Sequence, residues 1–168
     1  INSSVLASVM GATLATKRTS AERLAPGVDP DALVVEPYAN PFRTYPLAVD
    51  YNNFKKLFEE NNVDCYIFNT GSFMDKKIPK EVTLSALEQI VENKATFKPF
   101  GKIEGMEYMP VEGFEPDFTD AKYADQFAKR MQDRVAFIEK CAVEKEGFNK
   151  LPDEAEVAMK KVAEEAKA

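Results

Sequence analysis

The stretch VDCYIFNTG, residues 63–71, decides the predicted fold. Its first part, residues 63–68, is a short run made mostly of apolar, β-branched and aromatic side chains. Asn69, Thr70 and Gly71 follow it as turn residues. A run of this length and composition is typical of a strand buried on both faces of a sheet. We therefore expect residues 63–68 to form a buried central strand.

Helical patterns lie on both sides of this run. Before it, Asp50 can cap a helix from Tyr51 to about Glu60. After it, apolar residues at helical spacing predict a helix that follows Thr83, with a Ser85–Glu88 pattern that resembles a capping box. The predicted buried face of this second helix is Leu84, Leu87, Ile90 and Val91.

The rest of the chain adds further helices and one more strand. Helices are expected over residues 1–16 with Ser3 as N-cap, over 120–141, and from a cap at Asp153 onward. A short strand is expected over residues 33–35, and residues 95–118 are expected to be ordered but irregular. Helices that alternate with strands favour the α/β class.

Composition excludes several classes of function. The chain has 168 residues and a formal net charge of −6, which argues against a protein that grips the phosphates of nucleic acid. No stretch approaches the roughly 18 apolar residues of a membrane span, so no membrane partner is expected. Cys65 and Cys141 match no zinc motif, and two cysteines with no disulfide framework favour a cytoplasmic protein.

Motifs of catalysis are absent from the sequence. The chain contains no histidine, so it lacks the usual general base at neutral pH and the commonest ligand of transition metals. It also has no P-loop, dinucleotide-binding, nucleophile-elbow or zinc-protease pattern. We therefore expect no catalytic residue and no metal ligand in this chain alone.

The candidate site follows the predicted strand. Lys76 and Lys77 come shortly after residues 69–71, where open α/β sheets bind ligands, and they can meet a polyphosphate as point charges. Thr83 can offer its hydroxyl to a ligand or cap the following helix. The alternative interpretation is an ordinary connection between a strand and a helix, in which the lysines only keep the surface soluble.

The order of these motifs resembles the C-terminal region of the ATP-type phosphoenolpyruvate carboxykinases. That family has a strand ending in NTG, a glycine-rich loop, a KRI tripeptide and a threonine five residues after the isoleucine. This chain has YIFNTG at residues 66–71, KKI at 76–78 and Thr83 at the same offset. GATLATKRTSAE at residues 11–22, ANPF at 39–42 and VEGFEPDF at 111–118 follow the family order, so the similarity spans roughly residues 9–140.

The resemblance implies a fold, a site and a partner. Residues 1–142 would be the C-terminal, nucleotide-pocket wall of a mixed-sheet domain with flanking helices, and 143–168 a helical extension. Lys77, Ile78 and Thr83 would line the adenine–ribose end of the pocket, beside Lys76. The intact parent would bind ATP with Mg²⁺ or Mn²⁺ and convert oxaloacetate by decarboxylation and phosphoryl transfer. Its phosphate loop, metal ligands and oxaloacetate-binding arginine would lie in an N-terminal remainder ahead of Ile1, and a start other than Met agrees with this.

Two other functional hypotheses stay open. The glycine-rich loop is reduced to residues 72–75, Lys77 replaces an arginine, and Pro79 stands where the family has a serine. These differences favour a non-catalytic or repurposed relative that keeps the scaffold as an interaction domain. The third hypothesis is an independent small α/β interaction domain. Neither the substrate nor the choice between ATP and GTP follows from the sequence.

Overall fold

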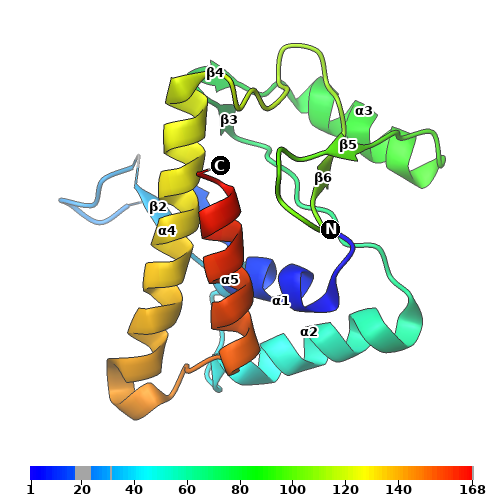
Figure 1. Cartoon of the computed structure of the whole chain (residues 1–168). Helices are drawn as coiled ribbons and strands as arrows, with labels where there is room; N and C mark the ends of the chain where they lie inside the picture. Colours follow the sequence, from blue (N-terminus) through cyan, green and yellow to red (C-terminus); the bar gives the residue numbers. More distant parts are fainter. Residues whose placement is uncertain (18–23, 31, 168) are drawn as a thin grey trace.

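Four helices form the core of the computed structural model, which describes residues 1–17, 24–30 and 32–167 (Figure 1). These helices are α1 (Ser4–Ala12), α2 (Leu47–Asn61), α4 (Ala121–Val143) and α5 (Asp153–Glu165). Helix α1 packs against α2 and α5, and α5 packs against α4. The family-like stretch at residues 11–22 lies partly outside the described residues.

Helix α1 is the centre of this core. Ser3 caps it as predicted, because its Oγ accepts a hydrogen bond from the N–H of Leu6 at 3.4 Å. The helix ends at Ala12, four residues before the end of the predicted range, and the chain turns at Thr13 into a strand. Val9 and Ala12 are fully buried, since three other parts of the chain converge on this helix.

Helices α2 and α5 begin differently from the prediction. Helix α2 starts at Leu47, and its first turn is capped from far away, because the Leu47 N–H donates to Oδ1 of Asn149 at 3.1 Å. Asp50 therefore lies inside the helix rather than at its cap. Helix α5 starts at Asp153 after Pro152, and no side chain caps it. The predicted caps at Asp50 and Asp153 are wrong.

Helix α4 agrees closely with its prediction. Asp120 caps it by accepting a hydrogen bond from the Lys122 N–H at 2.8 Å. Its buried face, with Met131, Val135 and Ile138 nearly inaccessible, packs on the core. Helix α5, which follows a short 3₁₀ turn η2 (Glu144–Gly147), adds Met159 and its neighbours to the same core. The segment predicted as a C-terminal extension thus packs directly on α1 and α4.

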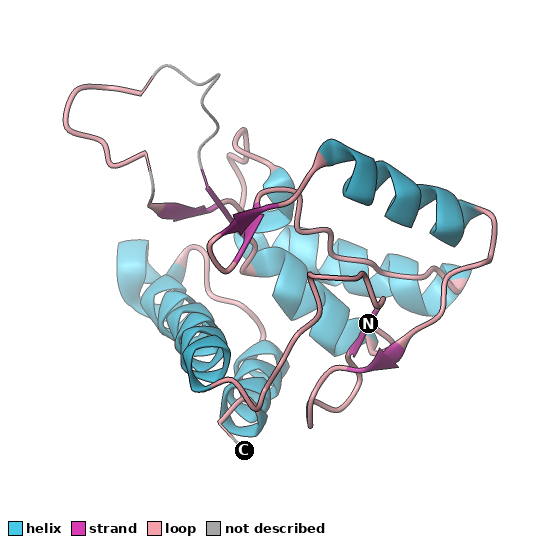
Figure 2. Ribbon diagram, turned by 90° about the horizontal axis from the view of Figure 1, so that it is seen from above, coloured by secondary structure: helices cyan, strands magenta, loops and turns pink. Residues whose placement is uncertain are grey.

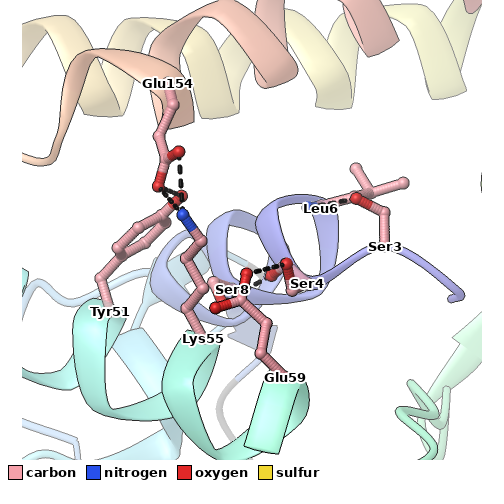
Figure 3. A network of polar contacts seen from close by, with 8 residues as sticks. All are labelled: Ser3, Ser4, Leu6, Ser8, Tyr51, Lys55, Glu59 and Glu154. Carbon is pink, nitrogen blue, oxygen red and sulfur yellow. Dashed lines mark hydrogen bonds and ion pairs between the residues drawn. The ribbon is translucent and has the colours of Figure 1, made fainter.

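A polar network joins α5 to α2 (Figure 3). Tyr51 is fully buried, and its Oη donates to Oε1 of Glu154 at 3.1 Å. Lys55 Nζ donates to both oxygens of the same carboxylate, at 2.7 and 2.9 Å. Ser4 of α1 donates to Glu59 on the next turn of α2 at 2.8 Å. The network orients the two helices around α1.

Replacing Glu154 with Gln should make stability less dependent on pH. The bond from Lys55, and then that from Tyr51, hold the pKa of Glu154 below its usual range. A lowered folded pKa stabilises the protein above the unfolded value, and this stabilisation is lost as pH falls through the folded value. Because Glu154 is 41% exposed, we expect a loss of about 1 kcal/mol or less at pH 7. Urea unfolding should show that the difference in free energy of unfolding between the variant and the unmodified protein disappears below about pH 4. A difference that grows in acid would contradict the assignment.

The strands of the described residues form three separate antiparallel pairs (Figure 2). They are β1 (Ala15–Lys17) with β2 (Leu33–Val35), β3 (Ser72–Phe73) with β4 (Lys76–Lys77), and β5 (Lys98–Pro99) with β6 (Glu107–Tyr108). The predicted strand over residues 33–35 is confirmed and is followed by a 3₁₀ turn, η1 (Pro37–Ala39). The described chain is therefore a combination of helices and small antiparallel sheets, which is compatible with the α/β class.

The predicted central strand is wrong. Residues 63–68 run as coil from the end of α2 to β3 and have no ladder partner. Tyr66, Ile67 and Phe68 are 41%, 45% and 38% exposed instead of buried. The physical reason is the lack of neighbours, since a central strand needs a strand on each side and cover on both faces. Every strand in the described residues has only two or three residues and pairs elsewhere.

Helix α3 (Lys80–Val91) also differs from its prediction. It starts directly after Pro79, before Thr83, so Ser85–Glu88 lies inside the helix and forms no capping box. No residue of α3 is buried, and Leu84 and Val91 are 61% and 76% exposed. The predicted apolar face therefore faces outward over most of its length, because no described element covers it.

Residues 95–118 are ordered and irregular, as predicted. They contain only the short β5–β6 pair, and aromatic rings attach them to α4. Phe100 and Phe118 contact each other edge-on at 5.3 Å between ring centroids. Both rings also contact Phe127 of α4, at 5.2 and 5.6 Å. This aromatic cluster ties the segment after α3 to the four-helix core.

Candidate functional site

An open hollow lies where the β3–β4 hairpin meets the start of α3. Its volume is about 640 Å³, and we call it the α3 hollow. It is lined by Thr70, Lys77, Ile78, Pro79, Lys80, Glu81, Thr83 and Leu84. In Figure 1 the hairpin and α3 lie together at the upper end of the molecule, away from α1 and α2.

The hairpin fixes the position of Lys77 and Ile78. Ser72 pairs with Lys77 and Phe73 with Lys76, and the turn between them needs the left-handed backbone of Met74 at φ 52°. The Ile78 N–H donates to the carbonyl of Gly71 at 2.9 Å and extends the ladder by one step. Ile78 is therefore almost fully buried, at 7% exposed, and forms the floor of the hollow.

The turn before the hairpin is locked by one side chain. Asn69 Nδ2 donates to the carbonyl of Ser72 at 2.8 Å, and Oδ1 of the same residue accepts from the Gly71 N–H at 3.2 Å. These two bonds fix the residues on either side of Thr70, which lines the hollow. The predicted turn at residues 69–71 therefore has a clear local cause in Asn69.

Three of the four predicted site residues meet in the hollow. Lys77, Ile78 and Thr83 all line it, although they belong to the hairpin and to α3. Lys76 does not line it, because successive side chains of a strand point to opposite faces. Lys76 and Lys77 are adjacent in the sequence, but the alternation of the strand places their side chains on opposite faces of the hairpin.

The structure adds residues to the site that the sequence reasoning missed. Lys80 and Glu81 line the hollow because α3 begins at residue 80. Pro79 was the signal in the sequence for this helix start, since proline is favoured at the beginning of helices. Thr70 lies in the NTG turn at residues 69–71, so its place beside the site also follows from the sequence pattern.

The start of α3 leaves backbone donors open toward this region. No side chain caps the helix, and Pro79 has no hydroxyl or carboxylate to offer. The Val82 N–H bonds to the Pro79 carbonyl at 3.1 Å, whereas the N–H groups of Lys80 and Glu81 have no acceptor within the described residues. The positive end of the helix dipole adds to this donor character.

The charges around the hollow are mixed and exposed. Lys77 forms no ion pair with any described residue, and Lys80 is 3.9 Å from Glu81 in a largely exposed pair. Such a pair is weak and can rearrange when a ligand binds. On the side of the hairpin, Lys122 of α4 pairs with Asp75 at 2.5 Å, and this bond raises the pKa of Lys122. That pair anchors the hairpin turn to the core.

The chemistry of the lining is that of a binding surface. Two ammonium groups, two threonine hydroxyls and open backbone N–H groups can hold an anionic or hydroxyl-bearing ligand. Ile78 and Leu84 offer apolar surface for a flat ring. The lining contains no histidine or cysteine that would serve as a neutral-pH base or a thiolate nucleophile.

Metal binding and membrane insertion find no support in the described residues. Across residues 1–17, 24–30 and 32–167, no group of three or more acidic, cysteine or histidine side chains is placed to hold a metal ion. Among the same residues, every helix is too short or too polar to cross a bilayer.

Comparison with other proteins adds no family assignment. Neither a protein-family model, nor a curated protein, nor a solved structure matches this chain.

Proposed function

We propose that this chain is the C-terminal part of a phosphoenolpyruvate carboxykinase-like protein and supplies one wall of its nucleotide pocket. The observation that supports this most is the meeting of Lys77, Ile78 and Thr83 on one hollow. These are the residues that the family resemblance assigns to the adenine–ribose end of an ATP site.

The properties of the lining fit a nucleotide. Ile78 and Leu84 provide the apolar surface on which a base can lie, and Thr83 can donate to or accept from a ribose hydroxyl. Lys77 and Lys80 bring positive charge to the same opening, where they attract the phosphate groups of ATP. The hollow is open on one side, so a second wall has to come from another part of the protein.

In this proposal the reaction belongs to the whole protein. The N-terminal remainder contributes the rest of the mixed sheet, the phosphate-binding loop and the ligands of Mg²⁺ or Mn²⁺. The intact cytoplasmic enzyme uses ATP in the decarboxylation and phosphorylation of oxaloacetate. The present chain binds and positions the nucleotide and is not catalytic alone.

Calorimetric titration of the full-length protein with Mg-ATP tests this proposal. The double variant Lys77→Ala/Thr83→Val should weaken binding about tenfold or more, which corresponds to about 1.4 kcal/mol. Lys76→Ala is the matched control, because Lys76 is the adjacent residue of the same exposed strand but does not line the hollow. It should change affinity less than about twofold. Equal losses in both variants, or no binding by the unmodified protein, would count against the proposal.

A second candidate function is a carboxykinase-like scaffold that no longer uses ATP. The tight β3–β4 turn favours it, because no glycine-rich loop lines the α3 hollow among the residues that the structure describes. Lys77 also lacks the planar fork with which an arginine stacks on a base. Absence of Mg-ATP binding by the full-length protein, with its fold intact, is the result that this alternative predicts.

A further inference from the structure

Residues 62–93 share little buried surface with the rest of the molecule, and we call them the α3 unit. The unit runs from Asn62, which ends α2 in a left-handed conformation, through the β3–β4 hairpin and α3 to Asn93, which is also left-handed. Within this fully described range, Ile78 is the one buried side chain, and it lies outside the hydrophobic core cluster. Helix α3 packs extensively against no other described helix or strand. The α3 unit therefore contributes no side chain to the core.

The elements of the α3 unit are too small to be stable by themselves. Helix α3 has 12 residues, and isolated helices of about this length are marginal in water. The β3–β4 hairpin has two residues in each strand, and an isolated hairpin is also marginal. Because local stability falls as buried apolar contacts become fewer, the position of the unit depends on its anchors to the rest of the chain.

Two anchors hold the hairpin against α4. The Phe73 ring contacts Tyr123 of α4 and Phe114, at 5.7 and 6.3 Å between ring centroids. In the turn that follows Phe73, Asp75 pairs with Lys122 of α4 at 2.5 Å. Figure 1 shows the hairpin beside the first turns of α4, with α3 away from the four core helices.

Two further links involve only the coil that precedes the hairpin. The Ile1 nitrogen donates to the Cys65 carbonyl at 3.0 Å, and the Tyr66 ring stacks on Phe97 at 5.8 Å between centroids. Neither link touches the hairpin or α3. The position of these two elements therefore depends mainly on Phe73 and the Asp75–Lys122 pair.

We propose that residues 62–93 open as one unit while the four-helix core stays folded, and that Phe73 and the Asp75–Lys122 pair form the latch that keeps the unit closed. The hairpin and α3 open together because Ile78 of the one and Thr83 of the other line the same hollow.

Opening of the unit removes the α3 hollow. All residues that line the hollow fall between Thr70 and Leu84, inside the unit. A ligand of the hollow therefore binds only the closed form and shifts the unit toward it. This consequence rests on the proposed function, whereas the opening itself needs no ligand.

Native-state hydrogen exchange of the 168-residue chain at low urea concentrations tests the proposal. The amides inside α3 should exchange at least about 100-fold faster than those inside α4, because the unit opens without the core. Exchange in α3 should also depend less on urea, since opening the unit exposes less surface than unfolding the whole chain.

Three variants test the latch. Phe73→Ala should speed exchange in α3 about tenfold and leave exchange in α1 and α4 within about twofold. Asp75→Asn should speed exchange in α3 about two- to fivefold, as expected for an exposed ion pair. Phe42→Ala is the matched control, because Phe42 is 87% exposed and lies outside the unit, and it should change neither rate.

Two results would overturn the proposal. The first is exchange in α3 that is as slow as in α4, with the same urea dependence, because the unit would then unfold only with the core. The second is a Phe73→Ala variant that speeds exchange in α3 and α4 equally, or in neither, because Phe73 would then be no latch. Nucleotide is absent from this experiment, so its outcome is independent of the Mg-ATP titration.

Discussion

Arg134→Met should destabilise the chain by about 3 kcal/mol. Arg134 lies on α4, and one nitrogen of its guanidinium, Nη1, donates to three oxygens at the end of α1. These are the carbonyls of Met10 and Thr13, at 3.1 and 3.0 Å, and Oγ1 of Thr13, at 2.8 Å. Burial lowers the pKa of Arg134 to about 10, so the side chain stays charged at neutral pH. The variant leaves these buried acceptors without a donor at the negative end of the α1 dipole.

Urea unfolding of two α4 variants checks this expectation. Arg130→Met is the matched control, because Arg130 is one turn earlier, 55% exposed, and 3.6 Å from Asp133 in a surface pair. It should change the free energy of unfolding by about 0.5 kcal/mol or less. If the Arg134 variant lost no more stability than the Arg130 variant, the link between α4 and α1 would not stabilise the core.

Met159→Ala should cost about 3 kcal/mol. Met159 of α5 is fully buried in the cluster that also contains Val9 of α1 and Val135 of α4. Truncation leaves a cavity between three helices, and a cavity adds to the lost burial energy. Since α5 belongs to this core, the variant should lower the stability of the whole chain in one cooperative transition.

Two further α5 variants complete this test. Val157→Ala, at a position 68% exposed on the same helix, should change stability by about 0.5 kcal/mol or less. Met159→Leu keeps most of the volume and should cost less than about 1.5 kcal/mol. A separate early transition for α5, with the remaining helices unaffected, would mean that residues 153–165 fold as an independent extension.

Local signals predicted the parts of the fold that depend on neighbouring residues. Ser3 caps α1 as expected, because a cap needs only the first turn of its own helix. Asp120, which was expected to be the first residue of its helix, caps α4 through a similar local contact. The start of α2 was not predictable in this way. The backbone N–H of Leu47 donates to Asn149, 102 residues away, and no sequence pattern near residue 47 indicates that partner.

The prediction of a central strand was wrong for a different reason. The composition of residues 63–68 is that of a strand, but a strand forms only when other strands pair with it. The same applies to α3, whose apolar residues have helical spacing yet meet no covering element.

The candidate site was predicted in part. The resemblance selected Lys77, Ile78 and Thr83, and these three residues do lie together. Lys76 was selected, like Lys77, as a cation after the predicted strand that could meet a polyphosphate, and the alternation of a strand places its side chain elsewhere. Lys80 was missed because the helix was expected to follow Thr83, whereas α3 already starts at Lys80.

Lysine footprinting of the full-length protein tests the central claim most directly. Lys76 and Lys77 are adjacent and exposed, and neither forms an ion pair with a described residue, so acylation of the two can be compared within one peptide. With saturating Mg-ATP, acylation of Lys77 should slow several-fold, because the nucleotide covers the α3 hollow. Acylation of Lys76 should stay unchanged. Equal protection of both lysines, or protection of neither when Mg-ATP is bound, would contradict a nucleotide site at Lys77, Ile78 and Thr83.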